Sequence, residues 1–175
     1  MWETFSSYQA SMKLPCLEGC GQCCLNPEVD ASTLEMIPIA LKIFDDGKLE
    51  EWLTKLDGPT QDHCLFYVRG NEPWQGQCGI YQERPALCRM FGVGGYMNKE
   101  REVTLSICKY ISQKYPAETL AAKEKAKTEK APVFAIWTSL VSNLGTPDLN
   151  QRLPINEALK RALHKISLLA QYENL

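Results

Sequence analysis

The sequence predicts an α+β fold, mostly α, in which a small cysteine-rich metal-binding domain with short hairpins is followed by C-terminal helices. Three observations lead to this prediction. All eight cysteines lie between Cys16 and Cys108. The same region holds short apolar segments separated by glycine-rich turns, which is typical of hairpins. Beyond Cys108, the apolar residues recur with helical spacing.

The chain has 175 residues, of which 45% are hydrophobic, so it can bury a core without disulfides. We expect a single domain over residues 1–175, with a metal-binding core at 14–110 and a helical extension at 111–175. The first residues lack the basic and apolar regions of a signal peptide, and no apolar run has the length of a membrane span. We therefore expect a cytoplasmic protein without a membrane partner. The net charge of −2 gives no basic field for nucleic acid.

Local signals predict most of the helices. A short helix is expected before Cys16, and the segment Ser32-Thr33-Leu34-Glu35 has the form of a capping box. A helix over 49–56 should end at Gly58-Pro59. Three further helices are expected over 117–130, 133–144 and 155–172. The last of these carries an apolar stripe that should pack in the core: Ile155, Leu159, Ala162, Leu163, Ile166, Leu169 and Ala170.

Two hairpins are expected between the cysteines. The first pairs residues 64–68 with 77–81 around a turn at 70–73. The second pairs residues 91–97 with 103–107, where apolar and polar residues alternate. The glycines at 92–95 lack the lysine and the spacing of a phosphate-binding loop.

The first four cysteines, Cys16, Cys20, Cys23 and Cys24, follow the pattern C-x3-C-x2-C-C. Glycines between them allow tight turns, so several thiolates can converge on one point. In a chain without an export signal, such a cluster indicates metal ligands rather than disulfides. Soft thiolate ligands select zinc, Cu(I) or iron–sulfur clusters.

The other four cysteines, Cys64, Cys78, Cys88 and Cys108, are widely separated single residues. A zinc ribbon normally supplies its ligands as two C-x2-C-like pairs. A single compact cluster closed by separate cysteines favours an iron–sulfur cluster, most naturally of the 4Fe–4S type. Zn²⁺ bound by four thiolates remains the alternative.

At residues 14–110 the chain resembles the YkgJ-type cysteine-cluster family, a zinc- or iron-chelating domain. The resemblance rests on the four clustered cysteines, on Cys64-Leu65-Phe66, on residues 78–91 with their Cys-x-Ile-Tyr-x-x-Arg-Pro-x-x-Cys-Arg pattern, and on Cys108. It implies metal binding through the cysteines. It supplies no reaction and says nothing of the C-terminal helices.

Arg84 and Arg89 flank Cys88 and are candidate cofactor-binding residues, because a guanidinium can offset the negative charge of a thiolate-rich centre. Pro85 should hold Arg84 in an extended conformation. The aromatic residues Tyr81 and Phe91 are expected to pack in the core.

Three functional classes follow from these features. The first is a metal-binding protein with an iron–sulfur cluster, acting in redox chemistry, sensing or metal handling, with an unidentified protein or redox partner. The second is an interaction module organised by zinc. An enzyme is the least supported class. Cys16, Cys20 and Cys23 have radical-SAM spacing, but the chain lacks the length and repeats of the barrel those enzymes need.

Overall fold

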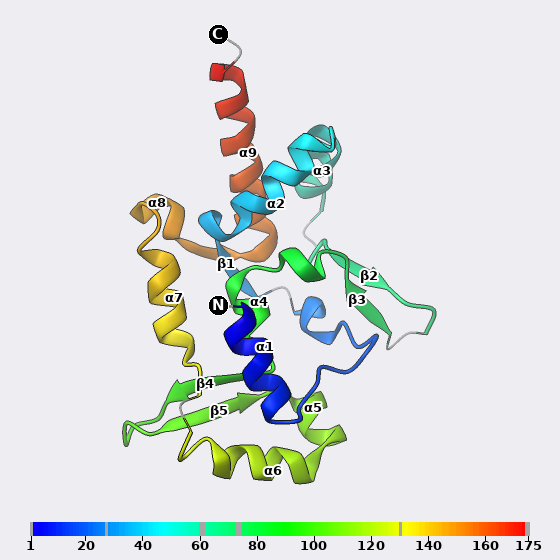
Figure 1. Ribbon diagram of the computed structural model, residues 1–175. Helices are drawn as coiled ribbons and strands as arrows, with labels where there is room; N and C mark the ends of the chain where they lie inside the picture. The colour runs from blue at the N-terminus through cyan, green and yellow to red at the C-terminus, as the bar shows by residue number, and fades with distance from the viewer. Residues whose placement is uncertain (1, 27, 60–61, 73–74, 130, 174–175) are drawn as a thin grey trace. The chain divides into compact units, whose positions relative to one another are not determined.

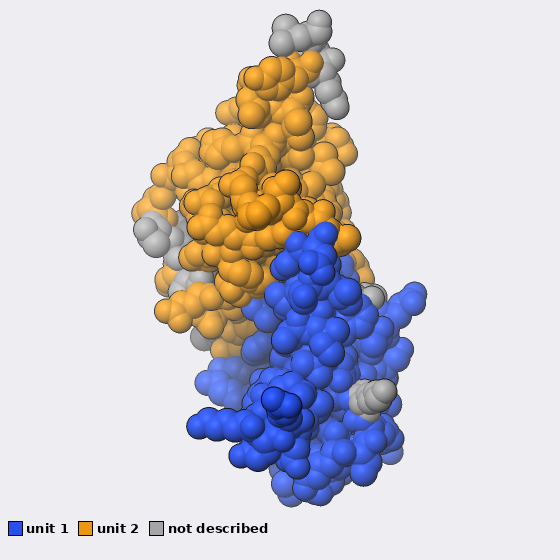
Figure 2. Space-filling model, turned by 90° about the vertical axis from the view of Figure 1, so that its left-hand side faces the viewer, with its two compact units in different colours: residues 1–18, 86–143 blue, residues 19–85, 144–175 orange. Residues whose placement is uncertain are grey.

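The computed structural model describes residues 2–26, 28–59, 62–72, 75–129 and 131–173. The chain divides into two compact units, which Figure 2 distinguishes by colour. Unit 1 comprises Met1–Glu18 and Ala86–Asn143, and unit 2 comprises Gly19–Pro85 and Leu144–Leu175. The single domain over residues 1–175 stays a prediction.

Unit 1 combines one antiparallel hairpin with helices. Its described elements are α1 (Trp2–Ser11), α4 (Ala86–Met90), β4 (Val93–Met97), β5 (Val103–Ile107), α5 (Lys109–Lys114), α6 (Pro116–Lys125) and α7 (Phe134–Ser142). Strand β4 pairs with β5 so that Val93 lies opposite Ile107 and Met97 lies opposite Val103. Helices α1 and α7 contact β4, and α6 contacts β5. The second predicted hairpin is confirmed.

The core of unit 1 depends on close packing at the hairpin. A Cβ on Gly94 would lie 2.1 Å from the ring of Phe134, so only glycine lets α7 approach β4 this closely. Leu14 and Ile111 are buried in one apolar cluster, and Phe5 and Met90 are buried in another.

Unit 2 carries Cys20, Cys23 and Cys24 of the cysteine cluster, and it also carries the longest described helix. Its described elements are η1 (Gln22–Leu25), β1 (Asp30–Ser32), α2 (Thr33–Asp45), α3 (Leu49–Asp57), β2 (Tyr67–Arg69), β3 (Gly76–Cys78), η2 (Tyr81–Glu83), α8 (Pro147–Asn150), β6 (Arg152–Pro154) and α9 (Ile155–Glu173). Helix α2 begins at the predicted capping box, where Ser32 Oγ accepts from the Glu35 amide at 3.2 Å. The Glu35 carboxylate accepts from the Ser32 amide at 2.8 Å.

Helices α2 and α9 pack side by side and supply the apolar core of unit 2 (Figure 1). On α9, the predicted stripe is buried from Ile155 to Ile166. The stripe does not continue as predicted, because Leu169 is 57% exposed. In the described part of the chain, no helix has both the length and the apolar character that crossing a membrane requires.

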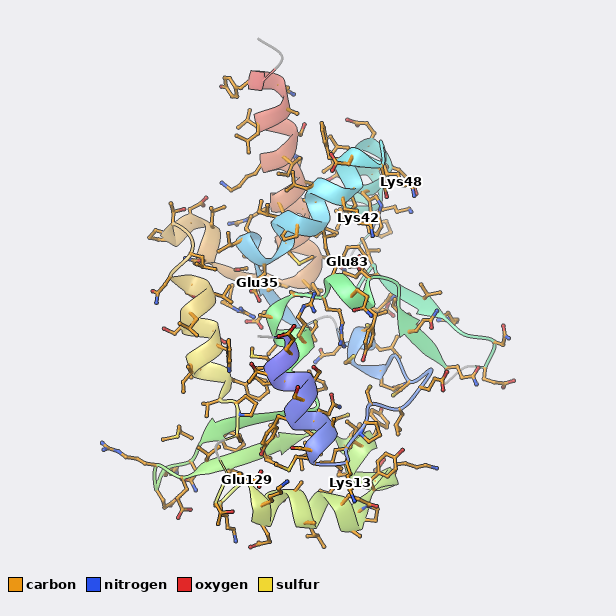
Figure 3. The ribbon with its side chains drawn as sticks, viewed as in Figure 1. Lys13, Glu35, Lys42, Lys48, Glu83 and Glu129 are labelled. Carbon is orange, nitrogen blue, oxygen red and sulfur yellow. The ribbon has the colours of Figure 1, made fainter. Side chains whose placement is uncertain are left out.

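A short strand pair precedes the two long helices α2 and α9, and no sequence pattern predicted it. Strand β1 pairs with β6, placing Asp30 opposite Pro154. The Arg152 guanidinium binds the Asp30 carboxylate at 2.9 Å and the Glu35 carboxylate at 2.8 Å. Glu35, labelled in Figure 3, has only 4% of its side chain exposed. Arg152 therefore ties the entry of α9 to the capping box of α2.

The first predicted hairpin forms, but its strands are shorter and shifted. Strand β2 begins at Tyr67 and pairs with β3, with Tyr67 opposite Cys78. The residues before β2 form a turn instead of a strand, in which the Tyr67 amide donates to Cys64 O at 2.9 Å. The residues after β3 form a turn that leads into η2. The Gly79 amide still donates to Phe66 O at 2.8 Å. The predicted bounds were wrong because the residues beyond this bond form turns instead of extended strands.

Residues 19–21, which include Cys20 and precede η1, form a loop that we call the cysteine loop. This loop packs directly against the hairpin. The Gly76 amide donates to Gly19 O at 2.9 Å. Gly21 adopts φ +57°, and a Cβ there would lie 2.6 Å from the Gly76 carbonyl carbon and 2.7 Å from the Tyr67 ring. The backbone conformation and the available space both require glycine at this position.

Replacing Gly21 with alanine should therefore destabilise the protein more than the same change at a left-handed glycine in open space. Gly47 is the matched control, because it has φ +68° and no atom within 4 Å of a built Cβ. Urea unfolding should show a loss of about 1 kcal/mol for Gly47→Ala and about 3 kcal/mol for Gly21→Ala, since overpacking adds to backbone strain. Equal losses in the two variants would contradict the close seating of the loop.

Candidate metal centre

Cys23 and Cys24 lie in η1, immediately after the glycine turn. The Cys24 amide donates to Gly21 O at 2.9 Å, which closes the turn that carries both thiols. Cys24 is buried and Cys23 is exposed. The two neighbouring thiols of this turn therefore differ in exposure.

Cys64 and Cys78 reach the same region from different parts of the chain. The Cys64 amide donates to Cys24 O at 2.8 Å, so these two residues are joined through their backbones. Cys78 ends β3, the strand on which the cysteine loop is seated. Three segments far apart in the sequence thus supply cysteines to one place in unit 2.

Asn156 of α9 holds the segment that carries Cys64. Its Oδ1 accepts from the Leu65 amide at 3.0 Å, and its Nδ2 donates to His63 O at 2.9 Å. Both backbone groups would otherwise lack a partner within a regular strand or helix. The side chain therefore fixes the residues on either side of Cys64.

The thiols of unit 2 interact with one another. The Cys24 thiol lies close enough to the Cys23 and Cys78 sulfurs to shift the pKa of both. Cys64 is close enough to Cys78 and Cys23 for their charges to affect its own ionisation. In the described ranges, no three His, Cys, Asp or Glu side chains form a ready coordination group. The sulfurs converge without enclosing a fixed coordination sphere.

The four thiols differ in their pKa values, two of which are lowered and two of which are raised. Hydrogen bonding from Cys24, helped by the positive charge of Arg84, lowers the pKa of Cys23 to about 6. The hydrogen bond from Cys24 likewise lowers the pKa of Cys78 to about 7. The same hydrogen bonds raise the pKa of Cys24 well above its usual range, and burial raises the pKa of Cys64 to about 11. The thiolate is the form that binds a soft metal ion, and the lowered pKa values of Cys23 and Cys78 favour it.

Arg84 has a defined position beside these thiols. Its Nε donates to Tyr81 O at 3.0 Å, and its guanidinium lies 3.6 Å from the centre of the Tyr81 ring. Arg84 is extended, with ψ 142°, as predicted for a residue before proline. Its charge lowers the pKa of both Cys23 and Cys78. Arg89 lies in α4 of unit 1.

The predicted core positions of Tyr81 and Phe91 are wrong. Tyr81 is 43% exposed and Phe91 is 49% exposed. Tyr81 stacks on a guanidinium instead of on apolar side chains, and its element η2 is fixed to α2 by an ion pair. This pair joins Lys42 Nζ to Glu83 Oε1 at 3.0 Å, and both residues are labelled in Figure 3.

The remaining predicted ligands occupy other positions. Cys20 lies in the loop of unit 2 before η1 and is not among the hydrogen-bonded thiols of the described chain. Cys16, Cys88 and Cys108 belong to unit 1. Cys108 packs partly buried against the apolar cluster around Leu14 and precedes α5. None of the eight cysteines, all of which lie in the described ranges, forms a disulfide.

Three supporting residues were not identified from the sequence. Tyr67 covers Gly21 and donates from its hydroxyl to Gln75 O at 3.0 Å, Asn156 holds the Cys64 segment, and Tyr81 carries Arg84. The sequence could have indicated Tyr67 and Tyr81, because each lies three residues after a predicted ligand. Nothing local pointed to Asn156, which lies 91 residues from its partner Leu65.

The donor set suits a thiophilic metal. It consists of four thiols with one arginine beside them, and it contains no carboxylate or imidazole contact to a thiol among the described interactions. Thiolates of this kind bind zinc and iron well and bind Mg²⁺ or Ca²⁺ poorly. The chemistry of these thiols therefore suits zinc or iron.

A family model matches residues 15–109 of the chain. The family is CxxCxxCC, described as "Putative zinc- or iron-chelating domain", and the match includes all eight cysteines. Curated proteins and solved structures provide no match to the chain. The matched region covers more than half of the sequence, and its description agrees with the thiophilic donor set of unit 2. The chain belongs to the CxxCxxCC family of zinc- or iron-chelating domains.

Proposed function

We propose that this protein binds an iron–sulfur cluster through Cys23, Cys24, Cys64 and Cys78, and that it acts in redox chemistry, sensing or metal handling. The observation that carries the proposal is the convergence of these four thiols from three separate segments of unit 2. One exposed turn supplies two of them, and the folded hairpin region supplies the others singly. This arrangement is typical of a cluster held in a cysteine loop.

The chain's own residues prepare the site in three ways. The cysteine loop is fixed on the hairpin through Gly21, so the thiols are brought together by backbone packing. The lowered pKa values of Cys23 and Cys78 reduce the cost of forming the thiolates that a metal requires. Arg84 offsets part of the negative charge that several thiolates would gather. A bound iron–sulfur cluster would supply one-electron chemistry at this place.

Cys16, Cys20, Cys88 and Cys108 remain predicted ligands, of this centre or of a second one. They lie within the region that the family model matches. Arg84 and Arg89 remain the predicted residues that tune the centre, and the contacts of Arg84 with the thiol region favour it over Arg89.

The second candidate is a single zinc ion with a structural role. It is favoured by the hydrogen-bond contacts of Cys24 with Cys23 and Cys78. In a tetrahedral zinc site with Zn–S bonds of about 2.3 Å, neighbouring sulfurs lie about 3.8 Å apart, which is close to thiol contact distance. The thiolates of a four-iron cluster each bind a different iron and lie further apart, so close approach of the thiols favours zinc.

Metal analysis of protein purified without oxygen distinguishes these candidates. The iron–sulfur proposal predicts brown protein with a broad absorption near ~400 nm and iron with matching acid-labile sulfide. Colourless protein with about one zinc ion per chain would overturn the iron–sulfur proposal and favour the structural zinc site. Protein without bound iron or zinc, even after reconstitution with each metal, would overturn both.

Arg84 should matter for metal retention, because its charge lies beside Cys23 and Cys78. Replacing Arg84 with methionine removes this charge, which raises the pKa of both thiols and disfavours the thiolates that bind metal. Competition with a chelator should show about tenfold weaker metal binding, the usual effect of losing a group that supports a ligand. The matched control is Arg69→Met, an exposed arginine on the same hairpin region. Arg89→Met tests the other predicted arginine. If Arg84→Met retains metal as well as Arg69→Met does, Arg84 has no role at the centre.

A further inference from the structure

The Cys24 and Cys78 thiols form a contact between two separate elements. Cys24 lies in η1 and Cys78 ends β3, two elements that are in contact, and each thiol shifts the pKa of the other. Both are free thiols, the first buried and the second half-buried. Oxidation could join them without bringing distant parts of the chain together.

The backbones around this pair are already fixed to each other. The Gly76 amide donates to Gly19 O at 2.9 Å, and the space between Gly21 and Gly76 is too small for a Cβ. A disulfide needs its two Cα atoms about 4.4–6.8 Å apart, so it forms readily only where two segments already lie in contact. The seating of η1 on β3 provides such a contact.

The other thiols of unit 2 are less suited to pairing. Cys23 and Cys24 are neighbours across a trans peptide, so their Cα atoms are only about 3.8 Å apart, which is closer than a disulfide normally allows. Cys64 affects its neighbours through charge, and no hydrogen bond joins its sulfur to another thiol in the described chain. Cys24 and Cys78 are therefore the favoured pair.

We propose that the metal-free protein forms a Cys24–Cys78 disulfide when it meets a peroxide, so that metal binding and oxidation exclude each other at this site. The exclusion rests on the proposed function, because it assigns both sulfurs to the metal centre. A disulfide removes two of the four thiolates, and a bound metal in turn protects the sulfurs from the oxidant. The site would then release its metal as a response to oxidation.

The reaction balances with hydrogen peroxide as the oxidant. The Cys78 sulfur attacks one peroxide oxygen, the O–O bond breaks, and a sulfenic acid and one water molecule are formed. The Cys24 sulfur then attacks the sulfenic sulfur, the S–S bond forms, and the hydroxyl leaves as a second water molecule. The two thiols lose two electrons, the peroxide gains them, and the thiol protons end in the two water molecules.

Mass spectrometry of the full chain tests this inference. Reduced, metal-free protein is treated with a small excess of hydrogen peroxide, blocked with an alkylating reagent and digested with trypsin without reduction. Cys24 then lies in the peptide 14–42, and Cys78 lies in 70–89, because trypsin does not cleave before Pro85. We expect these peptides to be cross-linked, with fragmentation placing the bond between Cys24 and Cys78. A cross-link at other cysteines, or none, would overturn the inference.

Variants separate the cysteines that share a peptide. Trypsin releases Cys78 and Cys88 in the same peptide, so Cys88→Ala is the matched control. We expect Cys88→Ala to keep the cross-link and Cys78→Ala to lose it. Loss of the cross-link in Cys88→Ala and its retention in Cys78→Ala would overturn the assignment. The measurement on the parent protein needs no variant to fold.

Zinc uptake before and after oxidation tests the exclusion. We expect the oxidised protein to bind at least tenfold less added Zn²⁺ than the reduced protein, and dithiothreitol to restore uptake. Equal uptake by the cross-linked protein would overturn the exclusion. A cross-link in a protein that takes up neither zinc nor iron when reduced would overturn the proposed metal centre and leave the disulfide standing. Metal uptake by the reduced protein without this cross-link after oxidation would overturn the disulfide and leave the proposed metal centre standing.

Discussion

The candidate metal centre depends on the close seating of the cysteine loop on the β2–β3 hairpin. At Gly21 the two backbones approach so closely that no side chain fits between them, and the left-handed conformation of this residue turns η1 toward β3. The loop itself has few apolar residues to bury. Its position is therefore set by backbone packing, by Tyr67 above it and by the bond from the Cys64 amide to Cys24 O. The convergence of the thiols follows from this seating.

Once the thiols converge, their electrostatics follow from burial and from one another. The pKa of Cys24 is raised, so it keeps its proton, and its interaction with the neighbouring sulfurs lowers the pKa of Cys23 and of Cys78. Arg84 adds a positive charge whose position is set by stacking on Tyr81. The result is a mixed group of thiols and thiolates that can change its protonation as ligands bind. Such a group suits both metal binding and thiol oxidation, which share the thiolate as the reacting form.

The features predicted correctly from the sequence are those that depend on neighbouring residues. The capping box at Ser32 starts α2 because both of its hydrogen bonds join residues three positions apart. The β4–β5 hairpin follows from local alternation, and the extended Arg84 follows from Pro85. The clustering of Cys23 and Cys24 is visible in the chain itself, and the resemblance from 14 to 110 agrees with the family match over residues 15–109.

The features that were missed depend on contacts between distant residues. Arg152 lies 122 residues from Asp30, and their ion pair accompanies a strand pair too short to leave a sequence pattern. Asn156 supports the Cys64 segment across a similar gap. Tyr81 was expected in the core because it is aromatic, but its ring supports a cation and stays partly exposed. Which cysteines meet is likewise set by tertiary packing, and the spacing of the single cysteines contains no information on it.

The metal content of single cysteine variants tests the central claim most directly. Each of the eight cysteines is replaced in turn with serine, each protein is reconstituted under the same conditions without oxygen, and circular dichroism verifies the fold. The account predicts that the variants of Cys23, Cys24, Cys64 and Cys78 lose most of their bound metal, because each removes a thiolate from the convergent group of unit 2. Full metal content in all four of these variants would contradict it.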